Sequence, residues 1–142
     1  MRALTTLLLL LQLGASAAAE EVRLRVDGQD RTYLLERPPT KVPAPTIVAL
    51  HGAYGSAKGM AQLTDLARLG PRSGFVTVFP QSQAEVWNRF LPGQESPAAR
   101  ELFRRFDRPP ADIAFLRQIG ADLVRQGISA PARAFLVGLS NG

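Results

Sequence analysis

The sequence predicts an α/β fold in which a mostly parallel sheet carries an antiparallel hairpin at its N-terminal side. Residues 21–27 alternate apolar and polar side chains, as a half-buried antiparallel strand does, and after a short turn residues 31–36 return as its partner. Three later runs are continuously apolar, which is typical of strands covered on both faces: residues 46–50, 74–79 and 134–137. Helical patterns separate these runs, and strands that alternate with helices usually form a parallel sheet.

Two helices are predicted between the apolar runs. The first begins at Ser56, a favourable N-cap residue, and ends at Gly70-Pro71; its apolar face comprises Met60, Leu63, Leu66 and Ala67. The second opens at Pro109-Pro110 and ends at Gly127, with one face made of Ile113, Leu116, Gly120, Leu123 and Val124. Asp112 lies in its first turn, where negative charge is favourable. We therefore interpret Asp112 as a helix-start residue rather than a catalytic acid.

Two connections join these elements. Prolines at positions 38, 39, 43 and 45 predict a stiff, extended link between the hairpin and the first apolar run. Residues 81–108 show no regular pattern, and a loop of this length is often a lid or a binding wall. Trp87 and Asn88 lie within it. Two roles remain open for this pair, because they could line a pocket or cap the core below the loop.

The composition excludes several kinds of functional site. The chain of 142 residues is 46% hydrophobic and 20% charged, which is typical of a globular protein. It has no cysteine, so a disulfide scaffold, a thiolate metal site and a cysteine nucleophile are excluded. His51 is the only histidine, which excludes a metal centre with several histidine ligands. The net charge is +5, but acidic residues lie between the arginines, so we expect no nucleic-acid partner.

The first residues are typical of a secretory signal. Arg2 supplies a positive charge, Leu4 to Leu13 is a nearly unbroken apolar run, and the small residues of 15–19 suit a cleavage site. This run is too short to cross a hydrocarbon layer of about 30 Å as a helix. We therefore expect residues 1–19 to be removed, leaving no stable membrane anchor, and the protein to be secreted or periplasmic.

The last five residues, Gly138-Leu-Ser-Asn-Gly142, match the G-x-S-x-G motif directly after an apolar strand. In α/β-hydrolases this motif forms a sharp strand-to-helix turn that exposes the serine hydroxyl above the sheet. The glycines keep side chains out of the crowded approach of strand and helix. The motif therefore predicts Ser140 as a catalytic nucleophile, whereas the same letters elsewhere in a chain would indicate an ordinary turn.

The loop after the first apolar run completes the predicted site. In this fold the loop supplies one backbone N–H to the oxyanion hole, and the residue after the nucleophile supplies the other. We therefore expect donors at Ala53 or Tyr54 and at Asn141. His51 and Gly52 are predicted to brace the loop, because the catalytic histidine of this fold follows the serine in the chain.

These pieces together resemble the secreted polyhydroxybutyrate depolymerase and feruloyl esterase group of α/β-hydrolases. The matching pieces are Asp27-Gly28, Arg31-Thr-Tyr33, Ile47-Val-Ala-Leu-His-Gly52, Gly74-Phe75, Phe79-Pro80, Trp87-Asn88, Asp112-Ile-Ala-Phe-Leu116 and Gly138-Leu-Ser-Asn-Gly142. The resemblance implies a serine esterase that needs no cofactor or metal. Its substrate would be a polyhydroxyalkanoate, or a feruloyl or acetyl ester on plant polysaccharide.

The chain ends directly after the motif, whereas the acid and histidine implied by the resemblance lie further along such chains. We therefore expect residues 20–142 to be the N-terminal half of a catalytic domain, inactive by itself. The run 134–137 would then form an apolar sheet edge, which favours aggregation. Two alternatives stay open: a non-catalytic secreted remnant or binding module, and a dienelactone-hydrolase-like or peptidase-like enzyme of the same fold.

Overall fold

The computed structural model describes residues 19–39, 43–90, 93–106 and 109–142. Five strands form one sheet in the order β1-β2-β4-β3-β5. The strands are β1 (Glu20–Val26), β2 (Gln29–Glu36), β3 (Ala44–Leu50), β4 (Val76–Pro80) and β5 (Ser129–Gly138), and the helices are α1 (Ala57–Thr64), α2 (Leu66–Arg72), α3 (Pro97–Phe103) and α4 (Asp112–Arg125). Residues 1–18 of the predicted signal lie outside the described residues.

The sheet has the mixed topology that the sequence predicts. Strands β1 and β2 form the antiparallel hairpin, and β2 also runs antiparallel to β4, with Tyr33 opposite Pro80. Strand β3 is parallel to both β4 and β5. The carboxyl ends of the three parallel strands, at Leu50, Pro80 and Gly138, therefore share one edge of the sheet. This edge carries the candidate site.

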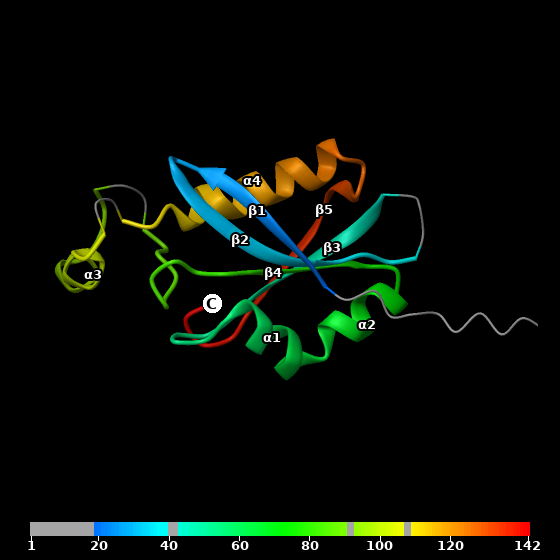
Figure 1. Cartoon of the computed structure of the whole chain (residues 1–142), viewed down its shortest axis with the longest axis horizontal. Coiled ribbons are helices and arrows are strands. Elements are labelled where there is room, and N and C mark those ends of the chain that lie inside the picture. Colours follow the sequence, from blue (N-terminus) through cyan, green and yellow to red (C-terminus); the bar gives the residue numbers. More distant parts are fainter. Residues whose placement is uncertain (1–18, 40–42, 91–92, 107–108) are drawn as a thin grey trace, which may run out of the picture.

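Helices cover both faces of the sheet, as Figure 1 shows: α4 lies on one face, and α1 and α2 lie on the other. On the α4 face the helix packs Phe115, Ile119 and Leu123 against sheet residues such as Val76 and Val78. A smaller cluster on the α1 face contains Ala49, Ala57, Met60 and Phe79. Burial of the larger of these side chains, the Val, Leu, Ile, Phe and Met residues, stabilises each by roughly 1.5–3 kcal/mol relative to exposure.

The predicted first helix is two helices in the structure. Asp65 adopts a left-handed conformation with φ of 55° and separates α1 from α2. Leu63, which the sequence places on the apolar face, is exposed. Gly70 does not end the helix, because α2 continues to Arg72. Instead, Gly70 is buried where an added Cβ would lie 2.8 Å from the Thr77 hydroxyl oxygen. The glycine therefore permits close packing of α2 on the sheet.

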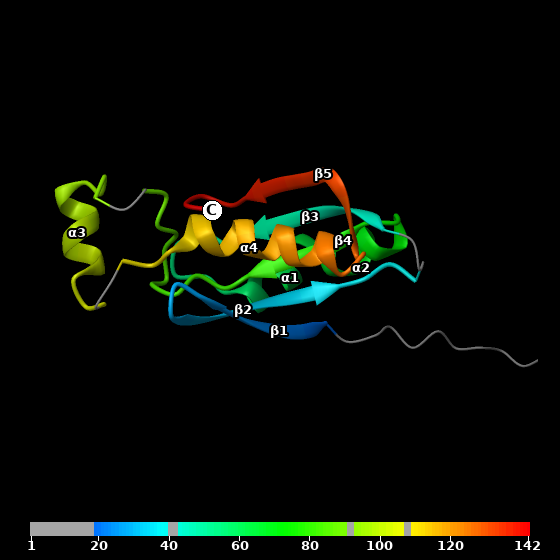
Figure 2. The ribbon, with the colours of Figure 1, turned by 90° about the horizontal axis from the view of Figure 1, so that it is seen from above.

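Three further expectations need correction. Helix α4 has the expected position, but its buried apolar residues are Phe115, Ile119 and Leu123, while Val124 is partly exposed. The segment after β4 contains the helix α3, which begins at the N-cap Ser96 and lies apart from the sheet in Figure 2. Strand β5 is longer than the predicted run 134–137, since it extends from Ser129 to Gly138. Its position at the sheet edge, with exposed apolar side chains, agrees with the apolar edge that the sequence predicts.

A buried ion pair joins the two sides of this fold. The Arg31 guanidinium of β2 donates to the Asp112 carboxylate of α4 across 2.5 Å, and both side chains are almost fully buried. The same guanidinium donates to the Gln81 carbonyl oxygen and lies 4.1 Å from the centre of the Phe115 ring. The second carboxylate oxygen of Asp112 accepts the Asn88 N–H at 2.6 Å. One cation and one anion therefore hold β2, α4 and the segment after β4 together.

Replacing the cation should destabilise the protein strongly. We expect Arg31→Met to lower the free energy of unfolding by about 3–5 kcal/mol, because a carboxylate would be left buried without its partner. Urea denaturation at neutral pH measures the loss. Arg23→Met is the matched control, since Arg23 is largely exposed on the neighbouring strand and its substitution should change stability little. Equal losses in the two variants would contradict this account.

The deficit of Arg31→Met should also depend on pH. Burial raises the pKa of Asp112, and the charge of Arg31 and the Asn88 N–H lower it partway. Without Arg31, the pKa of Asp112 rises further in the folded state. Stability from a group with a raised folded pKa is present at low pH and is lost as the pH rises through that pKa. The difference between wild type and variant should therefore be smaller at about pH 4 than at about pH 7.

Candidate functional site

Three loops meet at the carboxyl edge of the parallel strands. One follows β3, one follows β4, and the last follows β5 and carries Ser140. In Figure 1 the C-terminal end of the chain lies beside the turn between β3 and α1. Two contacts confirm this proximity: the Leu139 N–H donates to the Leu50 carbonyl, and a Cβ on Gly52 would lie 3.6 Å from the Cβ of Ser140. The loop after β3 therefore lies directly against the motif serine.

Ser140 adopts the strained conformation that the motif predicts. Its φ is 57°, a left-handed value that side chains other than glycine seldom adopt. The turn is closed by a hydrogen bond from the Gly142 N–H to the Leu139 carbonyl. A Cβ on Gly138 would lie 2.3 Å from the Gly142 carbonyl carbon, and a Cβ on Gly142 would lie 2.5 Å from the Leu50 oxygen. No side chain fits at either glycine.

The structure distinguishes the two candidate donors in the loop after β3. The Tyr54 N–H is already used, because it donates to the Glu85 carbonyl oxygen at 2.7 Å. Within the described ranges, the N–H groups of Ala53 and Asn141 donate to no protein atom. The candidate oxyanion pair is therefore Ala53 and Asn141. Tyr54 holds the loop through its backbone, while its side chain is 79% exposed.

His51 is placed as a brace. It is almost fully buried, its Nδ1 lies 2.8 Å from the Gly52 carbonyl oxygen, and its Nε2 accepts the Ser82 N–H at 3.1 Å. This pattern assigns the proton to Nδ1, since a carbonyl can only accept and the Ser82 amide can only donate. Both ring nitrogens are thus occupied by backbone groups, which leaves none to take the proton of a nucleophile.

Trp87 contacts two of the three loops. Its backbone N–H donates to Oδ1 of Asn141 at 2.7 Å, and its indole Nε1 donates to the His51 carbonyl oxygen at 2.8 Å. Its ring lies 5.0 Å from the His51 ring, centre to centre. The residue is buried and is not part of the cavity wall described below. The structure thus gives Trp87 a role besides the two that the sequence leaves open, because its hydrogen bonds join the loops after β3 and β5.

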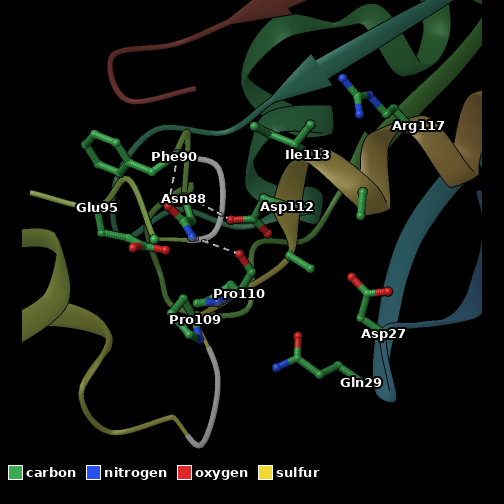
Figure 3. A pocket seen from close by; sticks show the side chains of 13 residues that line it. Asp27, Gln29, Asn88, Phe90, Glu95, Pro109, Pro110, Asp112, Ile113 and Arg117 are labelled. Carbon is green, nitrogen blue, oxygen red and sulfur yellow. Dashed lines mark hydrogen bonds between the residues drawn. The ribbon is translucent and has the colours of Figure 1, made fainter.

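Asn88 is one of the residues that line a cavity of about 620 Å³, shown in Figure 3. Its Nδ2 donates to the Pro110 carbonyl, and its Oδ1 accepts the Phe90 N–H. The cavity opens between the turn after β1, the segment after β4 and the start of α4. Its wall includes Asp112 but not Ser140. Asn88 therefore lines a cavity, but Ser140 does not line it.

Two residues that hold these loops could not be singled out from the sequence. In the sequence analysis Arg31 is named only as part of the family resemblance, and its partner Asp112 is 81 positions away in the chain. Gln81 has no predicted role, yet its Oε1 accepts the Ala57 N–H at the start of α1 and its Nε2 donates to the Ser82 carbonyl. The only signal in the sequence is a charged or amide side chain beside an apolar strand, which is too common to be decisive.

The described residues contain neither a metal centre nor a membrane-spanning helix. In the part of the chain that the structure describes, no group of three or more acidic or histidine side chains could hold a metal ion. Among the same residues no helix is long and apolar enough to cross a membrane.

Comparison with known proteins supports the fold. No family model matches the chain, and no curated protein matches it. Solved structures do match. One is a thermostable esterase, with a TM-score of 0.62 and 19% identity, where the match covers 87% of this chain and 35% of that chain. Another is an esterase of Pyrobaculum calidifontis, with a TM-score of 0.56 and 20% identity, where the match covers 87% of this chain and 36% of that chain. The fluorophosphonate-binding serine hydrolase F of Staphylococcus aureus is also similar, with a TM-score of 0.60 and 10% identity; the match covers 85% of this chain and 46% of that chain. The chain has the α/β-hydrolase fold. It spans less than half the length of these three structures.

The close packing around the motif glycines can be tested by adding a methyl group at Gly138. We expect Gly138→Ala to lower the free energy of unfolding by about 1–3 kcal/mol, because the added methyl overlaps the Gly142 backbone and the turn must open. Thermal unfolding measures the change. Gly120→Ala is the control: a Cβ there meets nothing within 4 Å on the exposed side of α4, so it should stabilise by roughly 0.5–1 kcal/mol. A neutral effect of Gly138→Ala would mean that the turn is open in solution.

Proposed function

We propose that the protein is an exported serine esterase that cleaves carboxylic esters through an acyl-enzyme on Ser140. The main support is the left-handed Ser140 between two glycines that admit no side chain, beside the amides of Ala53 and Asn141. A turn of this kind presents the hydroxyl above the sheet, where an ester can reach it. Export is proposed from the signal-like residues 1–19.

The reaction follows from these groups. The Ser140 oxygen attacks the ester carbonyl carbon while a general base takes its proton, and the carbonyl oxygen becomes an oxyanion. The amides of Ala53 and Asn141 would donate to this oxyanion, and such a donor contributes about 2.7–4 kcal/mol to the lowering of the barrier. The alcohol leaves with the transferred proton, and water then hydrolyses the acyl-enzyme.

The general base is proposed to come from outside residues 1–142. His51 cannot serve, because both of its ring nitrogens are occupied by backbone groups. Among α/β-hydrolases the catalytic acid and histidine follow the serine in the chain. The chain spans 35–46% of the length of the three similar structures, so they have room for such residues.

The proposed substrate is a polyhydroxyalkanoate, or a feruloyl or acetyl ester on plant polysaccharide. This choice rests on the resemblance of the motif pieces from Asp27 to Gly142. The proposal therefore names a class of substrates, and the bond that is hydrolysed is a carboxylic ester in each of them.

The nucleophile is tested by Ser140→Ala in the protein as its native gene encodes it. We expect wild type to bind a fluorophosphonate probe covalently and to hydrolyse p-nitrophenyl acetate, and the variant to lose both activities by 10³-fold or more, on the order expected for a lost nucleophile. Intact mass before and after labelling is the readout. Retained hydrolysis in Ser140→Ala would end the proposal.

The substrate class is tested by parallel assays on the same protein. The panel contains a p-nitrophenyl ester, a feruloyl ester, a polyhydroxybutyrate film, a dienelactone and a peptide. We expect cleavage of the simple ester together with either the film or the feruloyl ester, each abolished in Ser140→Ala. Preference for the dienelactone or the peptide would favour a neighbouring enzyme of the same fold, and cleavage of no ester would refute the esterase.

A further inference from the structure

A single tryptophan connects the two loops that carry the candidate oxyanion donors. Trp87 donates its backbone N–H to the Asn141 side chain and its indole N–H to the His51 carbonyl oxygen, at 2.7 Å and 2.8 Å. Asn141 supplies one candidate donor through its own amide. His51 lies two residues before Ala53, which supplies the other. Each bond therefore ends on the short segment that carries a donor.

Trp87 is itself held firmly. Two residues earlier, the Glu85 carbonyl accepts the Tyr54 N–H, and one residue later the Asn88 N–H is bound by Asp112. The indole is buried and packs against the His51 ring. The indole bond is buried, so it has little competition from water, and breaking it leaves the His51 carbonyl unsatisfied.

We propose that Trp87 is a positioning residue that sets the distance between the Ala53 and Asn141 amides. The proposal rests on the proposed esterase function. Trp87 touches neither the substrate nor the reacting atoms; it acts through the two segments that it joins. An oxyanion hole works only when both donors lie about 2.7–3.1 Å from the place that the oxyanion will occupy. A shift of one segment would therefore weaken transition-state binding more than binding of the neutral ester.

The two bonds can be removed one at a time. Trp87→Phe keeps the backbone N–H and an aromatic ring, and loses the indole donor to the His51 carbonyl together with one of the two fused rings. Asn141→Ala keeps the candidate donor amide, and loses only the acceptor of the Trp87 N–H. Phe103→Leu is the control for general loosening of the segment after β4, because Phe103 of α3 is buried with Ala84 and Ala99 in the cluster that packs α3 against this segment.

The experiment measures kcat and KM for p-nitrophenyl acetate with the native gene product and the three variants. It also measures the affinity for a trifluoromethyl ketone, which forms an oxyanion on the serine. Complete loss of one donor lowers kcat by about 10²–10³-fold, so a displaced donor should lower it by about 10–100-fold. We expect this fall in kcat for Trp87→Phe and Asn141→Ala, with an equal fall in ketone affinity and KM within about two-fold. Phe103→Leu should lower the melting temperature and leave kcat unchanged.

The outcomes separate this proposal from the esterase itself. If wild type shows hydrolysis that depends on Ser140 but Trp87→Phe keeps its kcat and ketone affinity, the positioning role is refuted and the esterase stands. The positioning role is also refuted if Phe103→Leu loses as much kcat as Trp87→Phe, because the effect would then be general. If wild type shows no hydrolysis that depends on Ser140, the proposed function fails first.

Discussion

The fold depends on one buried ion pair. Arg31 and Asp112 come from β2 and α4, which lie on different layers, and their pairing also fixes the segment after β4 through Gln81 and Asn88. A buried pair of this kind seldom adds much stability over a packed apolar pair, but losing one partner is costly. Its clearest contribution is geometric, because it links β2, α4 and the segment after β4 at one point.

Residues that are close in the chain connect this ion pair to the candidate site. Asn88, bound by Asp112, directly follows Trp87, whose two hydrogen bonds reach the loops after β3 and β5. At the end of β5 the motif glycines let the turn close on the backbone of Leu50. The serine is thus held by neighbours in space rather than by its own conformational preference, which would avoid a φ of 57°.

Much of the fold could be predicted from the sequence because its signals are local. The alternation in β1 and the apolar runs of β3 and β4 each depend on a few neighbouring residues, and the structure confirms these three strands. The break at Asp65 could not be predicted, since the apolar residues on both sides of it fit one helical pattern and a single left-handed aspartate leaves no periodic signal. The same holds for the candidate site. Ser140 could be predicted because it lies in a local motif, whereas the roles of Arg31 and Trp87 depend on hydrogen bonds to residues that are distant in the sequence.

The loop after β3 is anchored through its backbone, and this has a consequence for variation. The Tyr54 amide binds the Glu85 carbonyl, so the hold on the loop is independent of which side chain stands at position 54. That side chain projects into solvent one residue beyond a candidate oxyanion donor. Position 54 is therefore a place where side chains can be exchanged beside the candidate site without losing the backbone hydrogen bond that holds the loop. Asparagine or glycine, which tolerate a φ of 60°, would be the least costly replacements.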